Sequence, residues 1–127
     1  MANTGTFEKR KGDLSVKCAS AITDTRLAYR LSTTDHETVE LCGDNLAVAG
    51  LPDRKAAIGE SFVARWGDWS ALVGLSDGNG LLAINDPITS GATGYFRKAV
   101  IGTDLIQGYV LSPATNVAGT AFAFRPV

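Results

Sequence analysis

Short apolar runs follow one another along the chain and are separated by turn-forming residues. Within residues 26–31, for example, Leu27, Tyr29 and Leu31 alternate with other residues and would share one face of a strand. Each run has the length of a strand rather than of a helix. The pattern predicts strands over residues 26–31, 38–41, 60–66, 69–75, 81–84, 94–101, 105–111 and 119–125.

Glycines mark the turns between these runs, and helical segments are scarce. The 14 glycines are scattered rather than clustered. Residues 76–80 carry Asp-Gly and Asn-Gly in succession, which predicts a tight hairpin turn. Only residues 52–58 could form a single helical turn. The sequence therefore predicts an all-β fold, a small β-barrel or sandwich.

A faint internal repeat supports this fold class. Residues 46–65 can be aligned with residues 106–125 without a gap. Both copies read as an apolar strand, a polar turn that ends at glycine, and a strand with an inward phenylalanine. The repeat predicts two similar hairpins with both phenylalanines buried in one core. The identical pairs are Leu51 and Leu111, Gly59 and Gly119, Phe62 and Phe122, and Arg65 and Arg125.

The first 17 residues differ from the rest of the chain. They are polar, contain the cationic run Lys9-Arg10-Lys11, and offer Phe7 as the only large apolar anchor before Leu14. One interpretation is a frayed terminus. The other is an extended arm that becomes ordered against a partner, as charged segments with little apolar surface do. The predicted organisation is an N-terminal arm over 1–17 and a single β-barrel domain over 18–127.

Composition and charge restrict the possible partners. The 127 residues are 45% hydrophobic and 20% charged, which is typical of one globular domain. Twelve Lys and Arg against 13 Asp and Glu give a net charge of −1. Because nucleic-acid binding usually needs a basic excess, no nucleic-acid partner is expected. No window has the ~18 apolar residues of a membrane span, and the N-terminus lacks the apolar stretch of a secretory signal, so synthesis in a cytoplasm is expected.

The sequence offers no catalytic constellation. Cys18 and Cys42 lack the paired spacing of a zinc site and are expected to be buried, reduced thiols. The only histidine, His36, lies in a polar stretch between two predicted strands, which indicates a loop residue. Nucleophile-elbow, phosphate-loop and His-Glu-x-x-His motifs are absent. We therefore predict no catalytic, cofactor-binding or metal-binding residues, no cofactor, and a protein that is not an enzyme.

Two tryptophans allow three interpretations. Trp66 and Trp69 bracket the dipeptide Gly67-Asp68, with Arg65 adjacent. They could pack in the core, contribute to a protein–protein interface, or stack against a ligand. The even balance of charge around them favours the first two.

The second half of the chain resembles the small capsid decoration, or cement, proteins of tailed phages. Residues 85–99, Asn-Asp-Pro-Ile-Thr-Ser-Gly-Ala-Thr-Gly-Tyr-Phe-Arg-Lys-Ala, are similar to the family's segment Gly-Asp-Pro-Val followed by spaced Gly and Ala. The later strand, Ala-rich turn and closing strand also match, and the likeness covers residues 40–127. Two departures are Asn85, where the family usually has Gly, and residues 17–40, which have no clear counterpart.

This resemblance implies a tulip-like β-barrel that binds the outer surface of a mature phage head between capsomers and stabilises it. The implied partner is the major capsid protein, commonly bound by a homotrimer, and the implied location is the virion surface. An arm often contributes to the grip, which assigns Phe7, Lys9, Arg10 and Lys11 to capsid contact. Trp66 and Trp69 are assigned to an inter-subunit or capsid interface. The alternative function is a β-barrel accessory module that binds carbohydrate or another small ligand in its mouth.

Overall fold

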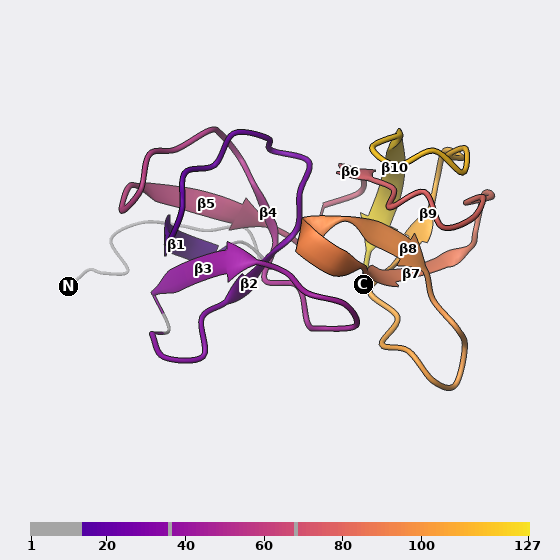
Figure 1. Cartoon of the computed structure of the whole chain (residues 1–127), viewed down its shortest axis with the longest axis horizontal. Coiled ribbons are helices and arrows are strands. Elements are labelled where there is room, and N and C mark those ends of the chain that lie inside the picture. Colours follow the sequence, from indigo (N-terminus) through magenta and orange to yellow (C-terminus); the bar gives the residue numbers. More distant parts are fainter. Residues whose placement is uncertain (1–13, 36, 68) are drawn as a thin grey trace.

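The computed structural model describes residues 14–35, 37–67 and 69–127, which form two lobes (Figure 1). The first lobe, residues 14–65, is a five-stranded sheet, and the second lobe, residues 72–126, is another. The first contains β1 (Leu14–Cys18), β2 (Tyr29–Leu31), β3 (Thr38–Leu41), β4 (Leu51–Pro52) and β5 (Ser61–Arg65). The second contains β6 (Leu72–Leu75), β7 (Pro87–Ser90), the 3-10 turn η1 (Ala92–Gly94), β8 (Phe96–Lys98), β9 (Gly108–Val110) and β10 (Ala121–Pro126).

The two lobes repeat one pattern of strand pairing. In the first lobe, β1 pairs antiparallel with β5 and parallel with β3, β2 pairs antiparallel with β3, and β4 pairs antiparallel with β5. In the second lobe, β6 pairs antiparallel with β10, β7 with β8 and β9, and β9 with β10. Strands β1 to β5 therefore correspond in order to β6 to β10. The repeat predicted from residues 46–65 and 106–125 is the C-terminal part of this larger duplication.

Isolated bridges complete the correspondence. An antiparallel bridge from Tyr29 to Gly50 joins β2 to the residue before β4, matching the pairing of β7 with β9. A parallel bridge from Ser76 to Phe96 joins the residue after β6 to β8, matching the pairing of β1 with β3. Single bridges, rather than continuous ladders, thus connect the outer strands of each sheet. The predicted all-β class, a small β-barrel or sandwich, is confirmed, and the described strands form two five-stranded sheets.

Several predicted elements differ from those observed. The strand over 38–41 is confirmed as β3, the runs at 60–66 and 69–75 contain β5 and β6, and the run at 119–125 covers β10 except for its last residue, Pro126. Residues 81–84 are not a strand, because only Leu82 forms a bridge, to Ala114. Residues 52–58 form no helical turn. The turn at 76–80 exists but does not close a hairpin, since β6 pairs with the distant β10.

The boundary predicted for the arm is also wrong. Leu14, Val16 and Cys18 alternate with Ser15 and Lys17 along β1, and Val16 and Cys18 are buried. Residues 14–17 therefore belong to a central strand of the first lobe rather than to an arm. Residues 1–13, the remainder of the predicted arm, lie outside the described residues.

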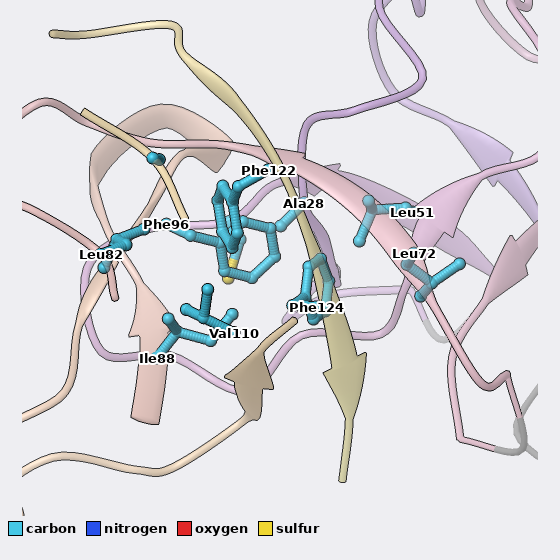
Figure 2. Packing of buried hydrophobic residues seen from close by; sticks show 11 residues of the cluster. Ala28, Leu51, Leu72, Leu82, Ile88, Phe96, Val110, Phe122 and Phe124 are labelled. Atoms are coloured by element: carbon cyan, nitrogen blue, oxygen red, sulfur yellow. The ribbon is translucent and has the colours of Figure 1, made fainter. Parts of the chain in front are cut away.

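The buried side chains form two clusters. One lies within the first lobe and includes Phe62, Val16 and Val39. The other fills the second lobe and extends to Ala28, Cys42 and Leu51 of the first lobe, so the two lobes share a core (Figure 2). Phe62 and Phe122 are 3% and 2% exposed, which confirms that both rings are buried. The prediction of one common core for them is wrong, because each ring packs in the cluster of its own lobe.

Candidate functional site

The predicted capsid-contact residues Phe7, Lys9, Arg10 and Lys11 lie outside the described residues. The described chain enters the first lobe at Leu14, which pairs with Ala64 near the end of β5. Because β5 ends at Arg65 and the next residue is Trp66, this entry point is close to the segment that joins the two lobes.

Trp66 and Trp69 lie in that joining segment, residues 66–71. The ring of Trp66 stacks on Phe96 with centroids 6.5 Å apart and planes inclined by 10°, and its Nε1 donates a hydrogen bond to the carbonyl oxygen of Val127 at 3.2 Å. The guanidinium of Arg65 lies 5.6 Å from the ring centroid of Trp69. Both tryptophans are partly buried against the shared core. Of the three interpretations, core packing therefore applies to both rings, and their assignment to an interface stays a prediction.

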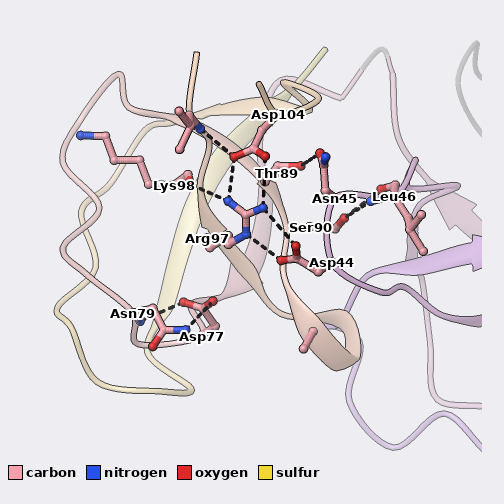
Figure 3. A network of polar contacts seen from close by, with 12 residues as sticks. Asp44, Asn45, Leu46, Asp77, Asn79, Thr89, Ser90, Arg97, Lys98 and Asp104 are labelled. Atoms are coloured by element: carbon pink, nitrogen blue, oxygen red, sulfur yellow. Dashed lines mark hydrogen bonds and ion pairs between the residues drawn. The ribbon is translucent and has the colours of Figure 1, made fainter. Parts of the chain in front are cut away.

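A buried polar network fixes the loop before β4 against the second lobe, and Figure 3 shows the contact of Ser90 with Leu46 that belongs to it. The side chain of Gln107 is at its centre. Its Oε1 accepts a hydrogen bond from the Val48 backbone N–H at 2.7 Å, and its Nε2 donates to the Leu46 carbonyl at 2.8 Å. The Ser90 hydroxyl also donates to the Leu46 carbonyl and accepts from the Leu46 N–H. Since these polar groups satisfy one another away from water, they specify how the two lobes dock.

An ion-pair network reinforces the same junction on the surface (Figure 3). Arg97 on β8 contacts Asp44 of the first lobe at 2.7 Å and Asp104 of the second at 2.8 Å. The Arg97 guanidinium, followed by the Val100 backbone N–H, holds the pKa of Asp104 below its ordinary value. The carboxylates of Asp44 and then Asp104 raise the pKa of Arg97 above that of a free guanidinium. The arrangement favours the charged forms of Arg97 and Asp104 and is a structural contact between lobes.

Residues with reactive side chains are dispersed or buried. Both cysteines are free and buried, and burial raises the pKa of the Cys42 thiol, which keeps it protonated and unreactive. His36 lies outside the described residues. Within residues 14–35, 37–67 and 69–127, no group of three or more His, Cys, Asp or Glu side chains is placed to hold a metal ion. In the same part of the chain, no helix has the length and apolar character of a membrane span.

Two shallow hollows lie beside residues 47–48, one within the first lobe and one at the junction. One, of about 260 Å³, lies between Arg30 and Leu31 on β2 and residues 47–49. The other, of about 200 Å³, lies between residues 47–48, Trp66 and residues 105–107. Sequence reasoning found neither the hollows nor the polar network, because both depend on contacts between residues that are distant in sequence, 44 and 61 positions apart for two hydrogen bonds of the network. The run of small apolar residues 46–50 was a signal only for a strand.

The comparisons with known proteins identify a fold. No protein-family model matches the chain, and no curated protein sequence matches it. A solved structure that does match is the head fiber gp8.5 N base of bacteriophage phi29, with a TM-score of 0.66. The alignment covers 91% of this chain and 92% of that chain, at 14% sequence identity. Both lobes and the segment that joins them are thus common to the two proteins as a fold.

Proposed function

We propose that this chain is a structural protein of a tailed-phage head. The observation that carries the proposal is the match of the two-lobed fold, over nearly the full length of both chains, to a phage head fiber base. The arrangement of the lobes supports a passive role, because their junction is filled by a shared apolar core, a satisfied polar network and ion pairs. Such a rigid body can present a fixed surface to a partner at little conformational cost.

The finer proposal is that of a decoration protein. It binds the outer surface of the mature head between capsomers as a homotrimer, and its partner is the major capsid protein. The resembling segment 85–99 supports this, since it forms β7, η1 and β8 at the junction. Asn85, which replaces the family's Gly, has φ +70°, a left-handed conformation that Asn tolerates better than most residues. Asn85 can therefore adopt the left-handed backbone conformation that a glycine would allow at this position.

The N-terminal segment is proposed as a strap on the capsid. Phe7 would anchor it, and the cations Lys9, Arg10 and Lys11 would steer it towards an acidic or mixed surface. Since β1 begins at Leu14, deletion of residues 1–13 leaves every described strand intact. The truncated protein should keep its melting temperature and bind heads at least tenfold more weakly, about 1.4 kcal/mol per site. Binding by the intact protein should also weaken as the salt concentration rises, because salt screens the charges of the segment. Lys55→Ala is the control: it removes an exposed positive charge outside the segment, between β4 and β5, and should not alter binding.

The test is a titration of the protein onto expanded heads that lack it and onto unexpanded proheads, followed by sedimentation and quantification of the bound fraction. The proposal expects saturable binding to expanded heads and at least tenfold weaker binding to proheads. Binding to the mature lattice alone would stabilise that lattice by mass action, seen as a higher temperature of head rupture. Equal binding to both, or binding to neither, would reject the decoration role. Glycan-dependent binding that ignores head maturity would favour the accessory-module alternative.

A further inference from the structure

The two lobes differ sharply in the chemistry of their tips, the ends that lie away from the junction. The first-lobe tip comprises residues 21–24 and the β4–β5 connection, residues 53–60. The second-lobe tip comprises the corresponding residues 81–84 and the β9–β10 connection, residues 111–120, drawn in gold in Figure 1. The bridge from Ile22 to Ala56 in one tip corresponds to the bridge from Leu82 to Ala114 in the other, so the comparison is between equivalent sites.

The first-lobe tip is charged, and the second is not. The first contains five charged residues, Asp24, Asp53, Arg54, Lys55 and Glu60. The second contains none, and residues 105–124 form an unbroken stretch without a charged side chain. Folding cannot require this difference, because the same strand pairing forms with either chemistry.

Apolar side chains are exposed on the second-lobe tip. Leu81 is 66% exposed, Ile84 is 60% and Val117 is 62%. Between residues 81–83 and 113–115 lies an open hollow of about 270 Å³, lined mainly by apolar atoms. Exposed apolar side chains gathered around a hollow are typical of an interaction site, whereas single exposed ones are ordinary.

Hydrogen bonds hold this tip in one conformation. Leu82 and Ala114 exchange two backbone hydrogen bonds of 3.0 and 2.9 Å. The Ser76 N–H donates to the Thr120 carbonyl at 2.9 Å, and the Gly119 N–H donates to the Ser76 carbonyl at 2.8 Å. The turn at Gly78 packs so closely that a Cβ there would lie 2.3 Å from the Ala118 nitrogen. A surface organised in this way loses little conformational entropy when it binds.

We infer that the second-lobe tip is a docking face for an uncharged, apolar patch of the coat protein. This inference rests on the proposed function and names the surface that would meet the shell. A charged partner is disfavoured, because its charges would lose water without gaining a counter-charge on the tip. The nearest acidic side chains are already engaged, Asp77 with Asn79 and Asp86 with the Ala83 N–H and Lys98, and they form a polar rim.

The size of the tip favours a coat lattice over a second copy of this chain in solution. A stable protein pair usually buries about 20–30 residues on each side. Residues 81–84 and 111–120 together are fewer than that, so the tip alone would hold a partner weakly. On a shell, a second contact through the N-terminal segment would make the tip contact intramolecular and raise its effective concentration. A small apolar face is therefore sufficient where the protein binds the shell through two contacts, the tip and the N-terminal segment.

The experiment compares Leu81→Asp and Val117→Asp with the matched control Ile58→Asp, which places the same charge on the first-lobe tip. Ile58 is 71% exposed, so all three variants should fold, as checked by circular dichroism and thermal unfolding. Leu81→Ser repeats the test without a new charge. We expect each Asp variant of the second-lobe tip to bind expanded heads at least tenfold more weakly, and Ile58→Asp to bind within twofold of the unaltered protein. In the protein that lacks residues 1–13, the remaining binding should be independent of salt.

The outcomes separate this inference from the function on which it rests. If the unaltered protein binds no heads, the proposed function fails and the docking face fails with it. If the unaltered protein binds but the Leu81 and Val117 variants bind equally well, the function stands and the docking face is wrong. An equal loss in Ile58→Asp would also overturn it. If free protein is oligomeric and the variants make it monomeric in sedimentation analysis, the tip contacts a second copy rather than the coat protein.

Discussion

Replacing Gln107 tests whether the buried polar network, rather than the apolar core alone, holds the two lobes together. The residue is 5% exposed and lies between the loop before β4 and strand β7. Gln107→Leu keeps a similar volume but removes the acceptor of the Val48 N–H and the donor to the Leu46 carbonyl. The Leu46 carbonyl retains the Ser90 hydroxyl as a donor, so only the Val48 N–H loses its partner outright.

The expected cost follows from these contacts. An amide left unsatisfied away from water costs about 1–3 kcal/mol, and the lost bond to the Leu46 carbonyl adds about 1 kcal/mol. The extra apolar surface of leucine offsets part of this, about 1 kcal/mol. We therefore expect Gln107→Leu to lower the free energy of unfolding by about 1–3 kcal/mol, a substantial share of the ~5–15 kcal/mol of an ordinary domain.

Urea unfolding, followed by tryptophan fluorescence and circular dichroism, measures the effect. Trp66 reports directly on the junction because it stacks on Phe96, so a loosened junction should change its fluorescence. Thr23→Val, at an exposed position of the first lobe, serves as a control and should change the free energy of unfolding by less than about 0.5 kcal/mol. A loss of less than about 0.5 kcal/mol in Gln107→Leu would refute the view that the network contributes to the docking of the lobes.

Three further outcomes are expected. Phe62→Ala and Phe122→Ala should each cost about 3–5 kcal/mol in denaturant unfolding, and the double variant should show the sum within about 0.5 kcal/mol, since the rings occupy separate clusters. Gly78→Ala should lower the melting temperature far more than Gly59→Ala: both glycines have φ +81°, but only at Gly78 would the new Cβ collide with backbone. Asp104 has a pKa held below its unfolded value, so its stabilising effect is complete above about pH 4 and is lost as pH falls through the lower folded pKa. The difference in unfolding free energy between the unaltered protein and Asp104→Asn should therefore shrink at acid pH.

Periodicity predicted the strands that have one buried face. Strand β3 was found at its observed bounds because Val39 is buried and its neighbours are more exposed. The same signal was present in β1, where Leu14, Val16 and Cys18 alternate with polar residues, but it follows directly on the cationic segment and was included in the arm. Strand β7 carries no such signal. Thr89 and Ser90 are fully buried there, and their hydroxyls are satisfied by partners about 17 to 44 residues away in sequence.

The sequence did not predict which strands pair with one another. Local turn chemistry predicted that residues 76–80 close a hairpin, yet the strand before them pairs with β10, the last strand of the chain. Likewise, the ungapped repeat aligned Leu51 with Leu111, whereas the connection between the paired strands spans residues 53–60 in one lobe and residues 111–120 in the other. Insertions in exposed turns cost little free energy, so the connections of two related hairpins can differ in length while the strand order stays the same. The candidate contact surface depends on this order and could not be assembled from local patterns.

The duplication itself separates the requirements of folding from those of recognition. Features that both lobes share, such as the strand pairing, the buried rings of Phe62 and Phe122 and the left-handed Gly59 and Gly119, are those that the fold needs. Features that differ between equivalent positions are free of that constraint. The charges of one tip and the exposed apolar side chains of the other are of this second kind. Exposed leucine and valine do not stabilise the folded chain, because their apolar surface stays in contact with water. If a partner covers these side chains, the removal of that surface from water contributes favourable free energy to binding.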